Sequence, residues 1–169
     1  MLSFVICSSG KNTNTLLGLV QLQQGDTVQA EALFDAVIDP ETAAPRVLQA
    51  AALSKIRNQQ VDEALALLKE AALAQPKSAE ILATYGIALV DKNSKDAEAI
   101  TWLDKSLAIE KKQPKVYLAK ARHFSALGKT NEAIEQLRIA VTLSPEQFEA
   151  QQILFQLMWS ANRAAETPA

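Results

Sequence analysis

The residues that could take part in catalysis are few and scattered along the sequence. His123 is the only histidine, and no carboxylate or cysteine near it in the sequence would complete a catalytic triad. Cys7 is the only cysteine, which excludes an internal disulfide and a zinc site built from paired cysteines. Gly10-Lys11 is faintly like the end of a phosphate-binding loop, but Phe4 and Asn12 replace residues that this loop requires. The sequence therefore predicts a protein that is not an enzyme and that has no metal or cofactor site.

The charged residues have structural explanations near expected helix ends. Negative charge in a first helical turn is favourable because of the helix dipole, which accounts for Asp62, Glu63, Glu132 and Glu146. Capping explains these carboxylates better than acid catalysis does. Four lysines form a local basic group: Lys111, Lys112, Lys115 and Lys120. Binding of an acidic or phosphorylated partner to this group stays open.

The composition favours helices and excludes several classes of partner. The 169 residues are 49% hydrophobic but only 5% aromatic, which is typical of helices packed through Ala and Leu. A net charge of -2 gives no field that would attract nucleic acid or an anionic membrane. No run approaches the roughly 18 to 20 apolar residues of a membrane span, and residues 1–10 lack a signal-peptide pattern. We expect a soluble protein, cytoplasmic or periplasmic. Whether a targeting signal exists outside this sequence stays open.

Small residues recur along the chain with a period of about 34. One series, expected in the first helix of each unit, has intervals of 34, 34 and 35 residues: Gly18, Ala52, Gly86 and Ala121. A second series, expected in the second helix, has intervals of 34, 35 and 34 residues: Ala30, Ala64, Ala99 and Ala133. The extra residue must lie between Gly86 and Ala99, in the polar turn at residues 91–96.

This period predicts four tandem helix-turn-helix repeats. They span residues 11–44, 45–78, 79–113 and 114–147, after an N-terminal extension at residues 1–10. Pro45, Pro76, Pro114 and Pro145 separate the repeats. Residues 148–169 are expected to form a further apolar helix and a tail, either as a cap or as half of an interrupted repeat. We favour a piece of a longer array over a complete small protein.

The repeat pattern resembles the tetratricopeptide repeat. Leu17-Gly18 followed by Ala30 and Phe34 matches its Leu-Gly and Ala-x3-Phe elements, and Pro145 matches its closing proline. The resemblance implies an all-α, right-handed superhelical solenoid whose first helices line a concave groove. It implies the following groove residues: Leu19, Leu22, Arg46, Gln49, Leu53, Ile56, Ile87, Val90, Lys115, Leu118, Arg122 and Trp159. The alternative for these apolar residues is ordinary packing between helices.

The leading prediction for function is a non-catalytic scaffold that binds a protein, as a peptide or an amphipathic helix, in this groove. The alternative is a structural spacer or self-assembly module, with a homodimer formed through exposed apolar ends. The Ala-, Leu- and Gln-rich stretch at residues 16–38 is also similar to repeat tracts of bacterial proteins of exopolysaccharide export and envelope assembly. That similarity implies a role in the cell envelope.

Overall fold

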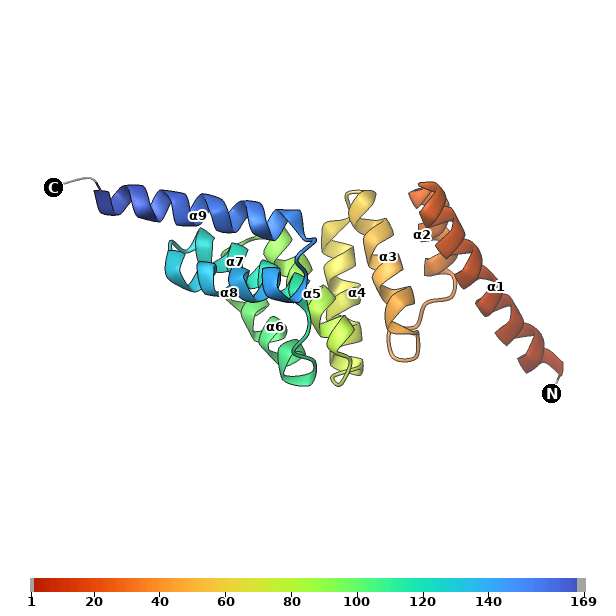
Figure 1. The fold of residues 1–169 in the computed structure, drawn as a ribbon. Coiled ribbons are helices and arrows are strands. Elements are labelled where there is room, and N and C mark those ends of the chain that lie inside the picture. The colour runs from red at the N-terminus through yellow and green to blue at the C-terminus, as the bar shows by residue number, and fades with distance from the viewer. Residues whose placement is uncertain (1, 167–169) are drawn as a thin grey trace. The chain divides into compact units, whose positions relative to one another are not determined.

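The computed structural model describes the course of residues 2–166 and the side chains of residues 13–160. Within this part the chain is helical and contains no strand. The helices, shown in Figure 1, are α1 (Leu2–Gln24), α2 (Thr27–Asp35), α3 (Pro45–Arg57), α4 (Val61–Ala74), α5 (Ala79–Lys92), α6 (Ala97–Ile109), α7 (Pro114–Ala126), α8 (Thr130–Leu143) and α9 (Phe148–Glu166). The predicted all-α repeat fold is confirmed. Helix α1 begins at Leu2, so most of the predicted N-terminal extension lies within the first helix.

The helices follow one another as pairs joined by short turns. Pro45 and Pro114 begin α3 and α7, where the missing backbone N–H costs no helical hydrogen bond. The turn between α5 and α6 covers residues 93–96 and is one residue longer than the turns at 58–60 and 127–129. This longer turn lies where the sequence placed the extra residue of the period.

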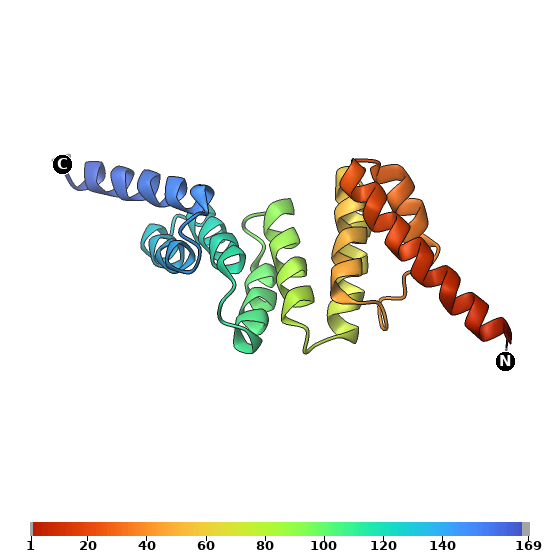
Figure 2. The same ribbon diagram turned by 45° about the vertical axis from the view of Figure 1, so that its right-hand side comes forward.

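The chain divides into two compact units, residues 1–84 and 85–169, with the boundary within α5. In the first unit, a buried cluster of Ala30, Phe34, Ala50 and Ala51 joins α2 and α3. In the second unit, α9 lies along α7 and α8 (Figures 1 and 2). The cluster that joins these three helices consists of Leu118, Ala121, Leu137, Ala140 and Ala150.

Two glycines allow paired helices to approach closely. A Cβ atom at Gly18 would lie 2.8 Å from Cε1 of Phe34, and one at Gly86 would lie 2.7 Å from Cδ2 of Leu103. Both distances are too short for carbon atoms in van der Waals contact. The large side chain at the second-helix position therefore fills the space that the glycine leaves open, as the periodic small residues had indicated.

Three of the turns within helix pairs end the first helix in the same way. Gly25, Gln59 and Gly128 have φ angles of 88°, 66° and 74°. In each case the next residue donates its N–H to a carbonyl five residues earlier, which is the hydrogen bond of a Schellman motif. Of these three residues, Gln59 alone has a side chain, and a side chain makes the left-handed conformation sterically unfavourable.

We expect Gln59→Gly to raise the free energy of unfolding by about 0.5 to 1 kcal/mol. Glycine removes the steric penalty at φ 66°, although it also loses more entropy on folding. Urea denaturation measures the change. Gln59→Ala is the control, because alanine keeps a Cβ atom and should give no gain; equal stabilisation by both substitutions would contradict this explanation.

Two glutamine side chains tie down the connections between successive pairs. Nε2 of Gln75 donates to the carbonyl oxygens of Pro40 and Ala43, both at 3.0 Å. Nε2 of Gln113 donates to the carbonyl oxygens of Glu110, at 2.7 Å, and of Ser106, at 3.2 Å. The Ser106 carbonyl also accepts the backbone N–H of Glu110 at 2.9 Å, so Gln113 adds a second hydrogen bond there. At the other carbonyls the amides supply a hydrogen bond outside the helices.

Candidate functional site

The predicted residues of α3 lie together on one exposed side of that helix. Their spacing of three or four residues places them opposite the buried Leu48, Ala51, Ala52 and Lys55. Leu53 and Ile56 are 41% and 38% exposed. The set Arg46, Gln49, Leu53 and Ile56 is called the α3 surface from here on.

Gln49 also has a structural role on the α3 surface. Its Nε2 donates to Oγ1 of Thr84 at 2.7 Å and approaches the carbonyl oxygen of Glu80 at 3.4 Å. Thr84 in turn donates its hydroxyl to the Glu80 carbonyl at 2.8 Å. This half-buried network joins α3 to the start of α5 within the first unit. The helix that carries Leu53 and Ile56 is therefore held to α5 by the hydrogen bonds of Gln49.

The predicted residues of α1 serve the core instead of an open surface. Leu19 and Leu22 are half-buried and pack against the cluster that contains Ala30 and Phe34. Exposed large apolar residues of α1 are Leu16, Leu17 and Val20, and of these Leu17 lies farthest around the helix from Leu19 and Leu22. This packing favours the alternative given for the apolar groove residues, and a partner contact at Leu19 and Leu22 stays a prediction.

In the second unit, two predicted groove residues are buried. Val90 on α5 and Leu118 on α7 are both buried, and Leu118 belongs to the cluster that packs under α9. These two assignments are wrong as contact residues, because neither side chain can reach a partner in this structure. Ile87 is half-buried and Lys115 is exposed.

Arg122 is exposed, but it is paired with two carboxylates. Its guanidinium lies 2.7 Å from Oδ1 of Asp91 on α5 and 2.9 Å from Oε1 of Glu149 on α9. Arg122 thus bridges three successive first helices of the second unit, and its charge is compensated. A partner that used Arg122 would have to replace these partly exposed ion pairs, which are individually weak.

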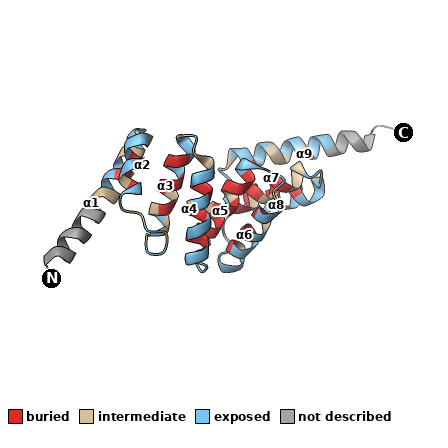
Figure 3. Cartoon of the chain, turned by 180° about the vertical axis from the view of Figure 1, so that it is seen from behind, coloured by how far each residue is buried: buried red, intermediate tan, exposed pale blue. Residues whose placement is uncertain are grey.

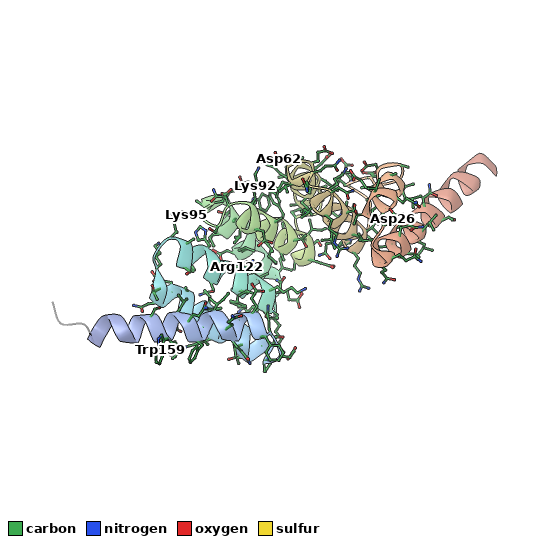
Figure 4. All side chains as sticks on the ribbon, turned by 90° about the horizontal axis from the view of Figure 1, so that it is seen from above. Asp26, Asp62, Lys92, Lys95, Arg122 and Trp159 are labelled. Carbon is green, nitrogen blue, oxygen red and sulfur yellow. The ribbon has the colours of Figure 1, made fainter. Side chains whose placement is uncertain are left out.

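Trp159 lies on α9, ten residues after Glu149, which is a pairing partner of Arg122. Figure 4 shows its side chain pointing away from α7 and α8. Its ring stacks on Phe155, with ring centroids 6.2 Å apart and an interplanar angle of 20°. Glu149, which pairs with Arg122, and Trp159 lie ten residues and about 80° apart around the helix, the same separation as Arg46 and Ile56 on the α3 surface. The assignment of Trp159 to the same groove as Arg122 therefore stays a prediction.

A cluster of charged side chains joins α2, α3 and α4 in the first unit, and sequence reasoning missed it. Lys55 is buried, and its Nζ lies 3.1 Å from Oε1 of Glu31, 3.0 Å from Oδ1 of Asp35 and 3.5 Å from Oε2 of Glu63. Nδ2 of Asn58 donates a hydrogen bond to Oε2 of Glu31. The one available signal was a lysine on the apolar side of α3, among Ala51, Ala52 and Ser54.

The electrostatics of this cluster favour its charged form. The hydrogen bond from Asn58 is the main cause that lowers the pKa of Glu31 below 4.5, and Lys55 adds to it against the opposing effect of burial. Burial alone would lower the pKa of Lys55, but hydrogen bonds to Asp35 and Glu31 outweigh it and raise that pKa above 10.5. The cluster links three helices through one buried cation and its carboxylate partners.

The remaining residues with reactive or aromatic side chains either pack in the core or fall outside the described part of the chain. His123 is buried beside Phe124, and its Nδ1 has no hydrogen-bond partner. Trp102 is buried against Tyr85, with ring centroids 5.3 Å apart, and its Nε1 donates to Glu98 at 3.0 Å. The side chain of Cys7 lies outside the described residues.

The described residues lack two further features. In that part of the chain, no three His, Cys, Asp or Glu side chains are placed so that they could hold a metal ion. None of the helices there has the length and apolar character needed to cross a membrane.

Comparisons with known proteins agree with the repeat period. The family model of the tetratricopeptide repeat matches residues 50–114. A crystal structure of MamA aligns with a TM-score of 0.77 over 94% of this chain and 86% of that chain, at 19% identity. MamA AMB-1 gives a TM-score of 0.74 over 90% of both chains at 20% identity. No curated protein matches the sequence significantly.

At these identities the likeness to solved structures concerns the fold alone. The repeat period, the helix pairs with their close glycine contacts, and the family match over residues 50–114 lead to the same assignment. Residues 50–114 match the tetratricopeptide-repeat family, and the helix pairs on both sides of this stretch continue the same type of repeat.

Proposed function

We propose that this chain is a non-catalytic scaffold that binds a partner protein on the α3 surface. Tetratricopeptide folds serve in general as scaffolds for contacts between proteins. The observation that supports this surface is the exposure of Leu53 and Ile56 on a helix whose opposite side is fully buried. Each large apolar side chain that a partner covers contributes about 1.5 to 3 kcal/mol.

The charges around the α3 surface favour an apolar partner segment with acidic flanks. Arg46 and Arg57 are both exposed and stand at the two ends of α3, with Leu53 and Ile56 between them. At 1.5 Å per residue, the two arginines are separated by about 16 Å along the helix axis. An amphipathic helix of about three turns, with acidic residues near its ends, matches this spacing.

Replacement of Leu53 and Ile56 by glutamate is expected to weaken partner binding at least about tenfold, because each charge would be buried against an apolar partner. Affinity capture with the full chain, followed by mass spectrometry, identifies the partner, and titration with that purified partner measures the dissociation constant. Ile87 is unsuitable for this test because it is half-buried, so its replacement would also disturb packing.

Leu73→Glu provides the matched control. Leu73 is 64% exposed but lies on α4, outside the α3 surface. We expect this variant to bind as tightly as the unmodified chain, and we expect all variants to keep their melting temperature. Undiminished binding by the Leu53 and Ile56 variant would rule out the α3 surface as the contact.

The alternative function, a self-assembly module, is favoured by a separate observation. The exposed aromatic residues of α9 lie in the second unit and take no part in the α3 surface. Binding of a partner in one unit and self-association through the other are compatible, and each can be tested without the other.

A further inference from the structure

One side of α9 exposes four large apolar side chains in a line. Phe148 is 81% exposed, Phe155 69%, Met158 46% and Trp159 59%, and these four residues are called the α9 surface. They lie opposite the side of α9 that packs on the core of the second unit, which consists of Ala150, Ile153, Leu154 and Leu157. Figure 3 shows the long pale-blue, exposed side of this helix. Helix α9 is therefore apolar on two opposite sides, and only one of them is covered.

The area of the α9 surface is close to what a stable interface needs. Large aromatic side chains offer 150 to 250 Å² each, so the four exposed side chains present roughly 500 Å² of apolar surface. The polar side chains beside them are Gln151, Gln152 and Gln156, all exposed. With these included, the side approaches the roughly 800 Å² that each partner buries in an interface of standard size.

The α9 surface carries no charge, and this feature bears on the kind of partner. Along this side of the helix the residues between the aromatic rings are Gln151 and Gln152. The nearest acidic residue, Glu149, is turned toward Arg122, with which it forms an ion pair of 2.9 Å. In a two-fold symmetric contact, the same patch meets itself, so a charged residue near the axis would face its own kind. A surface without charge is free of that repulsion.

We propose that the α9 surface binds the α9 surface of a second copy of this chain, in an antiparallel, two-fold symmetric pair. The steps from Phe148 to Phe155 and from Gln152 to Trp159 are both seven residues, or about two helical turns. An antiparallel pair can therefore place Phe148 against Trp159 of the other copy at both ends. The same register sets Phe155 against Gln152 of the other copy. Each aromatic side chain then loses most of its exposure to water.

The interface closes on itself and gives a dimer. A two-fold contact uses the same surface of both copies and leaves none for a third. The exposed apolar side of α1, with Leu16, Leu17 and Val20, offers the competing arrangement, in which α9 of one copy meets α1 of the next. That head-to-tail contact would not close and would give chains of increasing length.

Sedimentation velocity of the full chain between about 1 and 100 μM covers the range of weak to moderate dimers. We expect the average mass to rise from one chain to two and to stop there. Phe155→Glu is expected to raise the dimer dissociation constant at least about a hundredfold, because two copies of the new charge would meet near the axis. Phe155 is largely exposed, so the variant should fold, and circular dichroism checks this. If it does not fold, Phe148→Glu provides a second test, because its charge would be buried against Trp159 of the other copy.

Val20→Glu is the matched control, since it places the same charge on the exposed apolar side of α1. We expect it to leave the dimer unchanged. The fluorescence of Trp159 gives an independent measurement, because Trp102 is already buried and a blue shift on dimerisation must come from Trp159. The Leu53 and Ile56 variant should dimerise normally, which separates this proposal from the partner site on α3.

Three results would overturn the proposal. The chain could remain a monomer at the highest concentration, or Phe155→Glu could dimerise as well as the unmodified chain. Growth beyond two chains, abolished equally by Val20→Glu and Phe155→Glu, would show head-to-tail association between α1 and α9 instead.

Discussion

Replacement of Gly86 by valine is expected to lower the free energy of unfolding by about 2 to 3 kcal/mol. A Cβ atom at this position would lie 2.7 Å from Cδ2 of Leu103, 2.8 Å from its Cγ and 3.1 Å from its backbone nitrogen. The side chain of Leu103 could rotate away, but the backbone contact requires α5 and α6 to separate. Urea denaturation measures the loss. This separation would disturb packing along the pair, including the contact of Tyr85 with Trp102.

Two controls test whether the cost arises from this contact. Ala108→Val adds comparable volume at an exposed position of α6 and should cost only a few tenths of a kcal/mol, through helix propensity. Leu103→Ala removes the atoms nearest to the new side chain, so we expect the double variant to be more stable than the sum of the two single effects predicts. Strict additivity would show that the cost arises elsewhere.

Lys55→Met is expected to destabilise the first unit by about 2 to 3 kcal/mol at neutral pH. Methionine retains much of the volume and keeps the apolar contacts, but it leaves Glu31, which is largely buried, without its cation. Lys120→Met is the matched control: Lys120 pairs with one half-exposed carboxylate, Asp104, at 2.6 Å. A pair of that kind contributes about 1 kcal/mol or less. Equal losses in both variants would contradict the importance of the cluster.

The pH dependence of the Lys55→Met effect follows from the direction of the pKa shifts. The pKa of Glu31 is lowered from 4.5, so its contribution to stability is present above pH 4.5 and is lost as the pH falls through its folded value. The pKa of Lys55 is raised from 10.5, so its contribution is present below pH 10.5 and is lost as the pH rises through its folded value. We therefore expect the difference between Lys55→Met and the unmodified chain to be full at pH 7 and smaller near pH 3. A difference that stays constant over this range would argue against the ion cluster as its origin.

The repeat architecture could be predicted from the sequence because it depends on local and periodic features. The helix starts at Pro45 and Pro114 and the close approach at Gly18 and Gly86 are properties of single residues repeated in register. The longer turn at residues 93–96 followed from comparing two series of small residues. The exact limits of the repeats stay a prediction.

The exposure of individual side chains was less predictable, since it depends on which neighbours a helix has. The register of the repeats placed Leu118 in the groove, but α9 packs over α7 and buries it. Leu19 and Leu22 turn toward the core, while Leu16, Leu17 and Val20 of α1 are left exposed. The cluster around Lys55 could not be foreseen, because it depends on side chains 20 and 24 residues away adopting conformations that converge on one amine.

The ties made by Gln75 and Gln113 have a consequence for how this sequence can change over evolutionary time. Both amides bind backbone carbonyl oxygens, which every amino acid provides. Residues 40 and 43 can therefore be exchanged while the hydrogen bonds to their carbonyl oxygens persist. Gln75 cannot be exchanged in this way, because the shorter side chain of asparagine would not reach the carbonyl oxygens of residues 40 and 43. Variation among relatives should accordingly be higher at positions 40 and 43 than at position 75, directly after α4.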